Sequence, residues 1–176
     1  MYRDGRGVPQ DDAKAVRWYR LAADQGLADA QFSLGVMYAI GDGVPKDDAE
    51  AARWYRLAAD QGYVSAQFFL PLMYGTDEGV PQDAVEAVRW YHRAADQGLA
   101  RAQGNLGFMY DTGEGVPQDH VQAHIWFNLA ASRSTGELRD NSVKNRDRAA
   151  DELTPDGLNE AQRLAREWDA AHPREP

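Results

Sequence analysis

Two histidines, His120 and His124, lie four residues apart and are the first candidates for chemistry in this chain. At that spacing both imidazoles would share one face of a helix, where they could bind a metal ion together. The segment HVQAH has no glutamate between the histidines and no third ligand nearby, so it lacks the metalloprotease pattern. We therefore expect two partly exposed histidines near the start of a helix, with no metal and no other cofactor.

Other chemistry-bearing groups are also sparse. The acidic loops YGTDEG and YDTGEG carry oxygen ligands, but not at the alternating spacing of a calcium loop. The chain has no cysteine, no G-x-S-x-G motif, no S-x-x-K pair and no phosphate-binding loop. This leaves little basis for nucleophilic or phosphoryl-transfer chemistry, and we expect no catalytic residues.

The charge balance argues against nucleic acids and anionic membranes as partners. The 176 residues include 19 Lys and Arg against 28 Asp and Glu, a formal charge of -9. Nonspecific nucleic-acid binding requires clustered Lys and Arg to neutralise phosphates. No apolar run approaches the roughly 18 residues that span a bilayer, and the N-terminus lacks a signal-peptide pattern. We expect a cytoplasmic protein by default, or a periplasmic one if the chain is cut from a longer precursor.

A period of 36 residues organises the chain. Four tryptophans keep this interval, at Trp18, Trp54, Trp90 and Trp126. A G-V-P-Q/K-D loop keeps it as well and begins at Gly7, Gly43, Gly79 and Gly115. Self-similarity at a fixed period is the signature of repeat proteins, in which stacked copies bury a core that one copy cannot.

Each period contains two helical patterns. In the segment AVRWYRLAADQG and its copies, apolar residues follow the i, i+3, i+4, i+7 spacing of one helix face. An aspartate can cap the start of this helix and a glycine can end it, as Asp11 and Gly26 do in the first copy. The segment AQFSLGVMY and its copies form the second pattern. The expected architecture is all-α, a right-handed solenoid of antiparallel helix pairs.

Positions that repeat unchanged should form the packed core of such a solenoid. They are large apolar residues of the two helical patterns: Trp18, Tyr19, Leu34, Trp54, Tyr55, Leu70, Trp90, Tyr91, Leu106 and Trp126. One departure falls in the second copy of the AQFSLGVMY segment, a helix expected at about 65–74, where Pro71 replaces the glycine of Gly35 and Gly107. Proline removes a backbone donor, so we expect a kink there.

The pattern ends in the fourth copy, where AASRSTGE replaces AADQG. Two further helices are expected at about 141–153 and 155–170, the second with Thr154 as its N-cap and an apolar stripe along one face. We therefore divide the chain into repeats, residues 1–133, and C-terminal capping helices with a short tail, residues 134–176.

The combined motifs resemble a known repeat family. A-x-x-x-L-G-x-x-Y, then G-x-G-V-x-x-D, then A-x-x-W/Y-x-x-x-A-A-x-x-G follow one another within each period. This order resembles the Sel-1-like repeat, a relative of the tetratricopeptide repeat, whereas the tetratricopeptide period itself is about 34 residues. The resemblance covers roughly residues 1 to 133 and implies a scaffold or adaptor that binds proteins or peptides. The segment TPDGLNEAQRLAREW resembles the closing helix of bacterial members, which implies a bacterial source.

Recognition should then fall on exposed positions that differ between copies. If the first helix of each pair faces the concave surface, as in related solenoids, the partner-binding residues are Ser33, Val36, Phe68, Phe69, Leu72, Arg101, Asn105 and Phe108. An exposed apolar patch of this kind usually marks a partner site. We predict a groove for a peptide or a helix, with Phe69 and Phe108 as anchors. The alternative is that these side chains fill the seam between helices.

Two other hypotheses stay open. Some cysteine-rich relatives are linked to β-lactam binding, which raises an enzyme or small-molecule binder for cell-wall or β-lactam compounds, although this chain lacks Cys and S-x-x-K. The other is self-assembly. We expect the first complete helix to leave part of Trp18 and Leu21 uncovered, and either a homodimer through this open N-terminal edge or a removed upstream segment would cover both.

Overall fold

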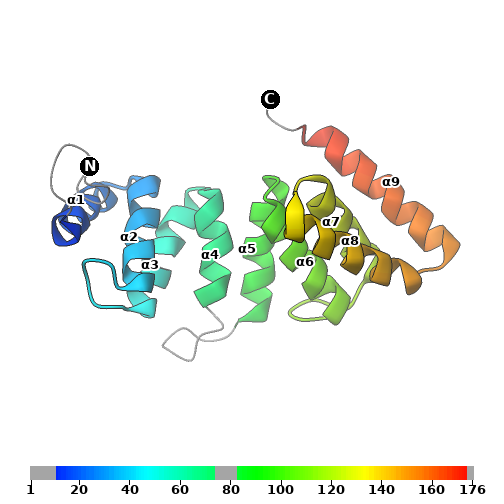
Figure 1. Cartoon of the computed structure of the whole chain (residues 1–176), viewed down its shortest axis with the longest axis horizontal. Coiled ribbons are helices and arrows are strands. Elements are labelled where there is room, and N and C mark those ends of the chain that lie inside the picture. The colour runs from blue at the N-terminus through cyan, green and yellow to red at the C-terminus, as the bar shows by residue number, and fades with distance from the viewer. Residues whose placement is uncertain (1–10, 74–82, 174–176) are drawn as a thin grey trace. The chain divides into compact units, whose positions relative to one another are not determined.

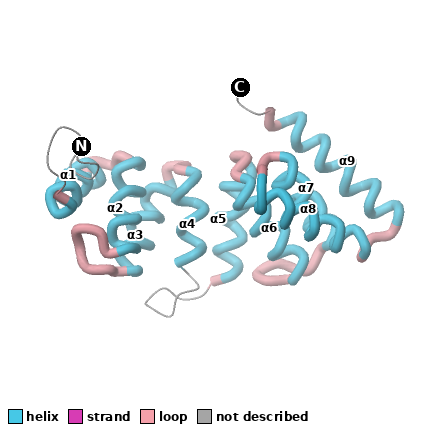
Figure 2. The backbone as a smooth tube through the Cα atoms, viewed as in Figure 1, coloured by secondary structure: helices cyan, strands magenta, loops and turns pink. Residues whose placement is uncertain are grey.

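The computed structural model describes residues 11–73 and 83–173, and every element in these ranges is a helix (Figure 2). The helices belong to two compact units, Met1–Gln82 and Asp83–Pro176. The predicted loops at Gly7 and Gly79 lie outside the described residues, as does Tyr74, the expected end of one helix. None of the described helices is long and apolar enough to cross a membrane.

The first unit contains four described helices, which alternate between the two sequence patterns (Figure 1). The RWY pattern, which is the segment AVRWYRLAADQG and its copies, forms α1 (Asp12–Asp24) and α3 (Asp48–Asp60). The A-Q pattern, which is the segment AQFSLGVMY and its copies, forms α2 (Ala28–Ile40) and α4 (Val64–Met73). Each helix packs against the next one along the chain, so the predicted pairing of helices is present in this unit.

The second unit continues the alternation and then departs from it. The repeats supply α5 (Ala84–Asp96), α6 (Ala100–Thr112) and α7 (His120–Ser132). Two further helices follow, α8 (Gly136–Asp151) and α9 (Pro155–Ala171), of which α8 begins earlier than expected. Because α7 packs against α6, α8 and α9, the last two helices share the core of the fourth repeat. The division of the chain at residue 133 stays a prediction.

The predicted aspartate caps are present on all four of these helices, α1, α3, α5 and α7, and the predicted glycines follow the first three. An aspartate Oδ1 accepts a hydrogen bond of 2.9 to 3.0 Å from the backbone N–H three residues later, at Asp11, Asp47, Asp83 and Asp119. The glycines after the first three of these helices have φ values of 86°, 88° and 83°. Such a conformation strains any residue with a Cβ, so these glycines end the helices.

The buried core contains most of the predicted residues, with one correction at the first copy. Trp54 is 3% exposed because it packs among small and aliphatic side chains of α1 and α2, which include Val16, Leu34 and Met37. Trp18 occupies the same position one repeat earlier and is 60% exposed. No helix pair among the described residues precedes α1, so Trp18 lacks the equivalent cover and is not a core residue in this structure.

Glycine in the A-Q helices allows an aromatic ring to approach the helix backbone. A Cβ added at Gly35 would lie 2.7 Å from the ring of Tyr55, and one added at Gly107 would lie 2.8 Å from the ring of Phe127. Pro71 holds the corresponding position in α4, where it is buried, and the helix continues to Met73. The kink that we expect at Pro71 stays a prediction.

Candidate functional site

The predicted partner-binding residues of the first unit lie on α2 and α4. Leu72 is 40% exposed, whereas the other four are half-buried: Ser33, Val36, Phe68 and Phe69. For Phe68 and Phe69 the burial has a local cause, because α2 and α4 are joined through aromatic side chains. The sequence placed these residues on the correct helices but overestimated their exposure.

Phe69 belongs to an aromatic cluster that links α2, α3 and α4. Its ring centroid lies 5.8 Å from that of Phe32, 6.0 Å from that of Tyr55 and 5.4 Å from that of Phe68. Tyr55 is a core residue, and its burial, assisted by the negative charge of Asp48, raises the pKa of its hydroxyl to about 12. Phe69 therefore contributes to the packing between helices, as the seam alternative requires.

The predicted residues of the second unit follow one another on α6. Phe108 is 49% exposed, and Arg101 is exposed as well. Asn105 is half-buried and hydrogen-bonds to Tyr91, a core side chain whose pKa is raised by burial. Phe108 is therefore accessible to solvent, and its role as an anchor stays a prediction, while Asn105 also holds α6 to α5. The eight residues are divided between the two units, so a continuous concave groove stays a prediction.

A repeated buried glutamine was missed in the sequence reasoning. The side-chain Nε2 of Gln31, Gln67 and Gln103 donates to the backbone oxygen of Ala23, Ala59 and Ala95 at 3.1, 3.2 and 3.1 Å. Each bond is a second one to a carbonyl near the C-terminal end of the preceding helix, which also accepts from the backbone N–H of the glycine three residues later at 2.9 Å. The signal was visible, because the A-Q pair itself recurs every 36 residues, at 30–31, 66–67 and 102–103. These glutamines are structural.

The two histidines of HVQAH have different environments. His120 is half-buried, with Nδ1 lying 3.3 Å from Oδ1 of Asp111. His124 is buried inside the second unit, so the expectation of partial exposure is wrong for this residue. Burial, with a smaller effect from Arg146, lowers the pKa of His124. Across the described residues there is no group of three His, Cys, Asp or Glu side chains that could hold a metal ion.

One more histidine replaces an arginine of the earlier copies. Arg20 donates from Nη2 to the hydroxyl of Tyr38. In the third copy the equivalent contact joins His92 Nε2 and the hydroxyl of Tyr110, which are 3.0 Å apart. His92 also packs edge-on against the ring of Trp126, and burial lowers its pKa.

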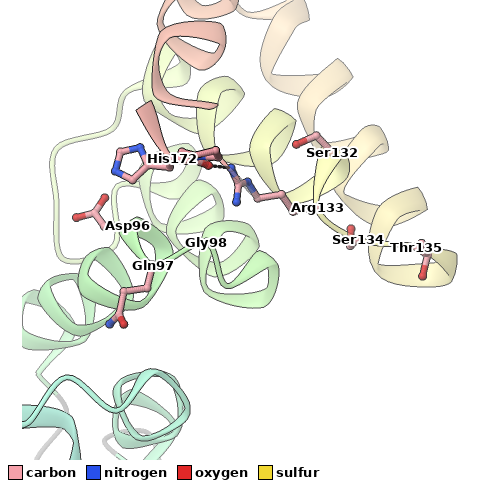
Figure 3. Close-up of a pocket in the computed structure, with 9 residues that line it drawn as sticks. Asp96, Gln97, Gly98, Ser132, Arg133, Ser134, Thr135 and His172 are labelled. Carbon is pink, nitrogen blue, oxygen red and sulfur yellow. Dashed lines mark hydrogen bonds between the residues drawn. The ribbon is translucent and has the colours of Figure 1, made fainter. Parts of the chain in front are cut away.

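A pocket of about 630 Å³ opens within the second unit beside the C-terminal end of α7 (Figure 3). Its walls come from residues 96–98 at the end of α5, from residues 132–135 at the end of α7, and from His172 and Pro173 after α9. Segment 132–135 lies in AASRSTGE, where the repeat pattern ends. Sequence reasoning noted that departure but assigned no site to it.

The alternating helix pairs, the repeated aspartate caps and the tryptophans buried at a fixed interval define an all-α repeat protein. The chain belongs to the Sel1 repeat family, whose repeat matches residues 1–27, 28–63, 64–99 and 100–134. Proteins of this family are generally scaffolds for protein interactions, and the fold is typically non-catalytic.

Two solved structures resemble the chain and confirm the predicted Sel1-repeat fold. A Sel1 repeat protein from Oxalobacter formigenes is 31% identical, with a TM-score of 0.74, over 90% of this chain and 72% of that one. The protein c5321, a protective antigen of uropathogenic Escherichia coli strains with an SLR fold, is 29% identical, with a TM-score of 0.52, over 96% of this chain and 43% of that one. A search of curated proteins gave no significant match. Both similar structures come from bacteria.

Proposed function

We propose that this chain is a non-catalytic scaffold that binds a protein or peptide through exposed apolar side chains at variable repeat positions. The observation that carries the proposal is a series at one repeat position, Val36, Leu72 and Phe108, each 36 residues after the last. Val36 is half-buried, Leu72 is 40% exposed and Phe108 is 49% exposed. This position carries a different side chain in each copy, as we expect for residues that recognise a partner. None of the three residues is among the repeated core residues.

The physical driving force would be the burial of this apolar surface. Fully burying a Leu or Phe side chain is worth about 1.5 to 3 kcal/mol, and half of that is still available at Leu72 and Phe108. Arg101 adds an exposed positive charge about two turns before Phe108 on the same helix. These features favour a partner segment that presents apolar side chains, such as a peptide or an amphipathic helix. Phe69 would contribute to the packing beneath this surface through its ring contacts with Phe32 and Tyr55.

A comparison of two double variants tests this proposal. In Leu72→Ser/Phe108→Ser the exposed series is removed from both units. In the control, Leu57→Ser/Val85→Ser, one exposed apolar residue is removed from an RWY helix of each unit, α3 and α5. Each chain is used to capture proteins from the native host, and captured proteins are quantified by mass spectrometry. Circular dichroism verifies that both variants remain helical.

We expect at least one host protein to be captured by the wild-type chain and by the control, and to be lost from the Leu72/Phe108 variant. Its affinity, measured afterwards with purified components, should fall about tenfold or more, since two half-exposed anchors together carry about 1.5 kcal/mol or more. Equal capture by both double variants would contradict the proposal, because the series would then be unnecessary for binding.

A second candidate function, self-association, has its own observation. Trp18 and Leu21 are 60% and 54% exposed and lie three residues apart on α1, so they share a face. A homodimer through this face would cover both side chains. Sedimentation at several protein concentrations should show a dimer that Trp18→Ser weakens and Leu57→Ser leaves intact. A concentration-independent monomer would refute self-association.

A further inference from the structure

The pocket at the end of the fourth repeat contains an arginine with unused hydrogen-bond donors. Arg133 stands where the earlier copies have Gln25, Gln61 and Gln97. Its side chain is only 10% exposed. Nη2 donates to Oδ1 of Asp169 at 2.6 Å and to the backbone oxygen of His172. Nε is buried without a partner, and the described residues provide no acceptor for Nη1. Only one of the three guanidinium nitrogens therefore donates a hydrogen bond, although buried polar groups normally have hydrogen-bond partners.

Aromatic packing holds this guanidinium in one orientation. Cζ of Arg133 lies 4.8 Å from the ring centroid of Trp168. The imidazole of His172 stacks on that ring from another side, with centroids 4.1 Å apart, and Trp126 contacts it edge-on at 5.9 Å. Figure 3 shows the Arg133 side chain reaching from the end of α7 to His172, with Gly98 close by. The donors are therefore preorganised, which lowers the entropic cost of binding.

Gly98 provides the space that Nη1 of Arg133 occupies. A Cβ added at Gly98 would lie 2.9 Å from Nη1. The equivalent glycines of the first two copies, Gly26 and Gly62, have nothing within 4 Å of such an atom. All three have a positive φ, but only at Gly98 does the missing side chain also accommodate an arginine. This contact joins the third and fourth copies and has no equivalent at Gly26 or Gly62.

The charges around the pocket restrict the ligand that would complete Arg133. Asp169 already pairs with the guanidinium, and Asp96 lines the pocket. The attraction to Arg133 and the repulsion from the two carboxylates both scale with the charge of the ligand, whereas the cost of removing that charge from water grows faster, so this charge balance favours a singly charged anion over a doubly charged one. Thr135, whose side chain makes no capping bond to α8, adds a hydroxyl to the pocket wall. The volume of about 630 Å³ suits a small molecule.

We propose that this pocket binds a small molecule through a singly charged carboxylate, which accepts hydrogen bonds from the Nη1 group of Arg133 beside Gly98. The remaining polar groups of the ligand face Thr135. This site is separate from the partner surface proposed above, because none of its residues belongs to the series Val36, Leu72 and Phe108. Arg133 also ties α9 to α7, so the experiment must separate ligand binding from this structural contact.

The test is a titration of the full chain with acetate and, separately, with inorganic phosphate, followed by NMR at the backbone amide of Gly98. Arg133→Gln introduces the residue that the earlier copies carry at this position, so the turn itself should form. Arg166→Gln, at an exposed position of α9, changes the net charge equally and serves as the control. Asp169→Asn removes the ion pair with α9 but retains Arg133.

We expect acetate to shift the Gly98 amide saturably, with an apparent Kd that rises about tenfold or more in Arg133→Gln, as expected for a hydrogen bond to a charged group. Arg166→Gln should bind like the wild-type chain, and Asp169→Asn should bind acetate at least as tightly, because a competing negative charge is gone. Three results would overturn the proposal: unchanged binding in Arg133→Gln, an equal loss in Asp169→Asn, or tighter binding of phosphate than of acetate.

Discussion

Trp18 and Trp54 occupy the same position of successive repeats, and their replacement by alanine should have different costs. Trp54 is 3% exposed and Trp18 is 60% exposed. A fully buried tryptophan removes about 200 Å² from water, which at about 25 cal/mol per Å² is worth about 5 kcal/mol. At Trp18 only the buried two-fifths of this amount is at stake, about 2 kcal/mol. Both values are upper bounds, because the unfolded chain also buries apolar surface.

Polar contacts increase the expected difference. Nε1 of Trp54 donates to Oε2 of Glu50 at 3.2 Å, and the guanidinium of Arg53 lies 4.4 Å from the centre of its ring. With these losses included, Trp54→Ala should lower the free energy of unfolding by about 3 to 5 kcal/mol. Trp18→Ala should lower it by at most about 2 kcal/mol.

Urea unfolding, followed by circular dichroism, measures both values in the same unit of the protein. Because the chain has two compact units, the transition of the first unit must be resolved from that of the second before a two-state analysis is applied. Equal costs for the two variants would refute the reasoning, since they would mean that Trp18 is covered as completely as Trp54. A cost near zero at Trp54 would equally contradict the burial argument.

Three further predictions concern the second unit. Gly107→Ala should lower the free energy of unfolding of this unit by about 1 to 3 kcal/mol, because the new Cβ would lie 2.8 Å from an aromatic ring. At Gly104 an added Cβ meets nothing within 4 Å, so Gly104→Ala should raise the free energy of unfolding by about 0.5 to 1 kcal/mol. Urea unfolding measures both values. Gln103→Leu should cost about 0.5 to 1.5 kcal/mol in thermal unfolding, because the Ala95 carbonyl loses one of its two donors and keeps only the N–H of Gly98; an unchanged melting temperature would contradict this. Finally, burial lowers the pKa of His124 in the folded chain. As the pH falls below about 6.5, the unfolded chain therefore binds more protons than the folded chain does, and the free energy of unfolding should decrease. His124→Gln should reduce the slope of this part of the stability profile, while His92, whose pKa is also lowered by burial, continues to contribute to it; an unchanged slope in His124→Gln would contradict the prediction.

Local features of the fold were readable from the sequence because they depend on neighbours along the chain. An aspartate cap bonds to an N–H three residues away, and a left-handed glycine ends the helix directly before it, so both recur wherever the motif recurs. The buried glutamines were equally readable in principle. Gln31 and its equivalents keep the period, and a polar residue that repeats beside core positions indicates a buried hydrogen bond.

The exposure of the candidate site was less predictable. Phe69 and Phe108 are both phenylalanines on A-Q helices, yet Phe69 packs on Phe32 and Tyr55 while Phe108 is 49% exposed. Whether such a side chain fills the seam or reaches solvent depends on the residues of the adjacent helix. His124 shows the same limit, because its burial requires the packing of α7 against α6, α8 and α9.

The sequence by itself determined the period of 36 residues, the alternation of two helices, their limits, and membership of the Sel1 repeat family. Those properties follow from hydrophobic spacing and from capping, which act over a few residues. Only the tertiary structure decided that Trp18 and Trp54 differ in burial, and that Arg133 lies between Gly98 and Asp169 with donors to spare. The reason is physical: burial and hydrogen-bond partnership belong to pairs of residues that folding brings together, and identical local sequences can acquire different neighbours.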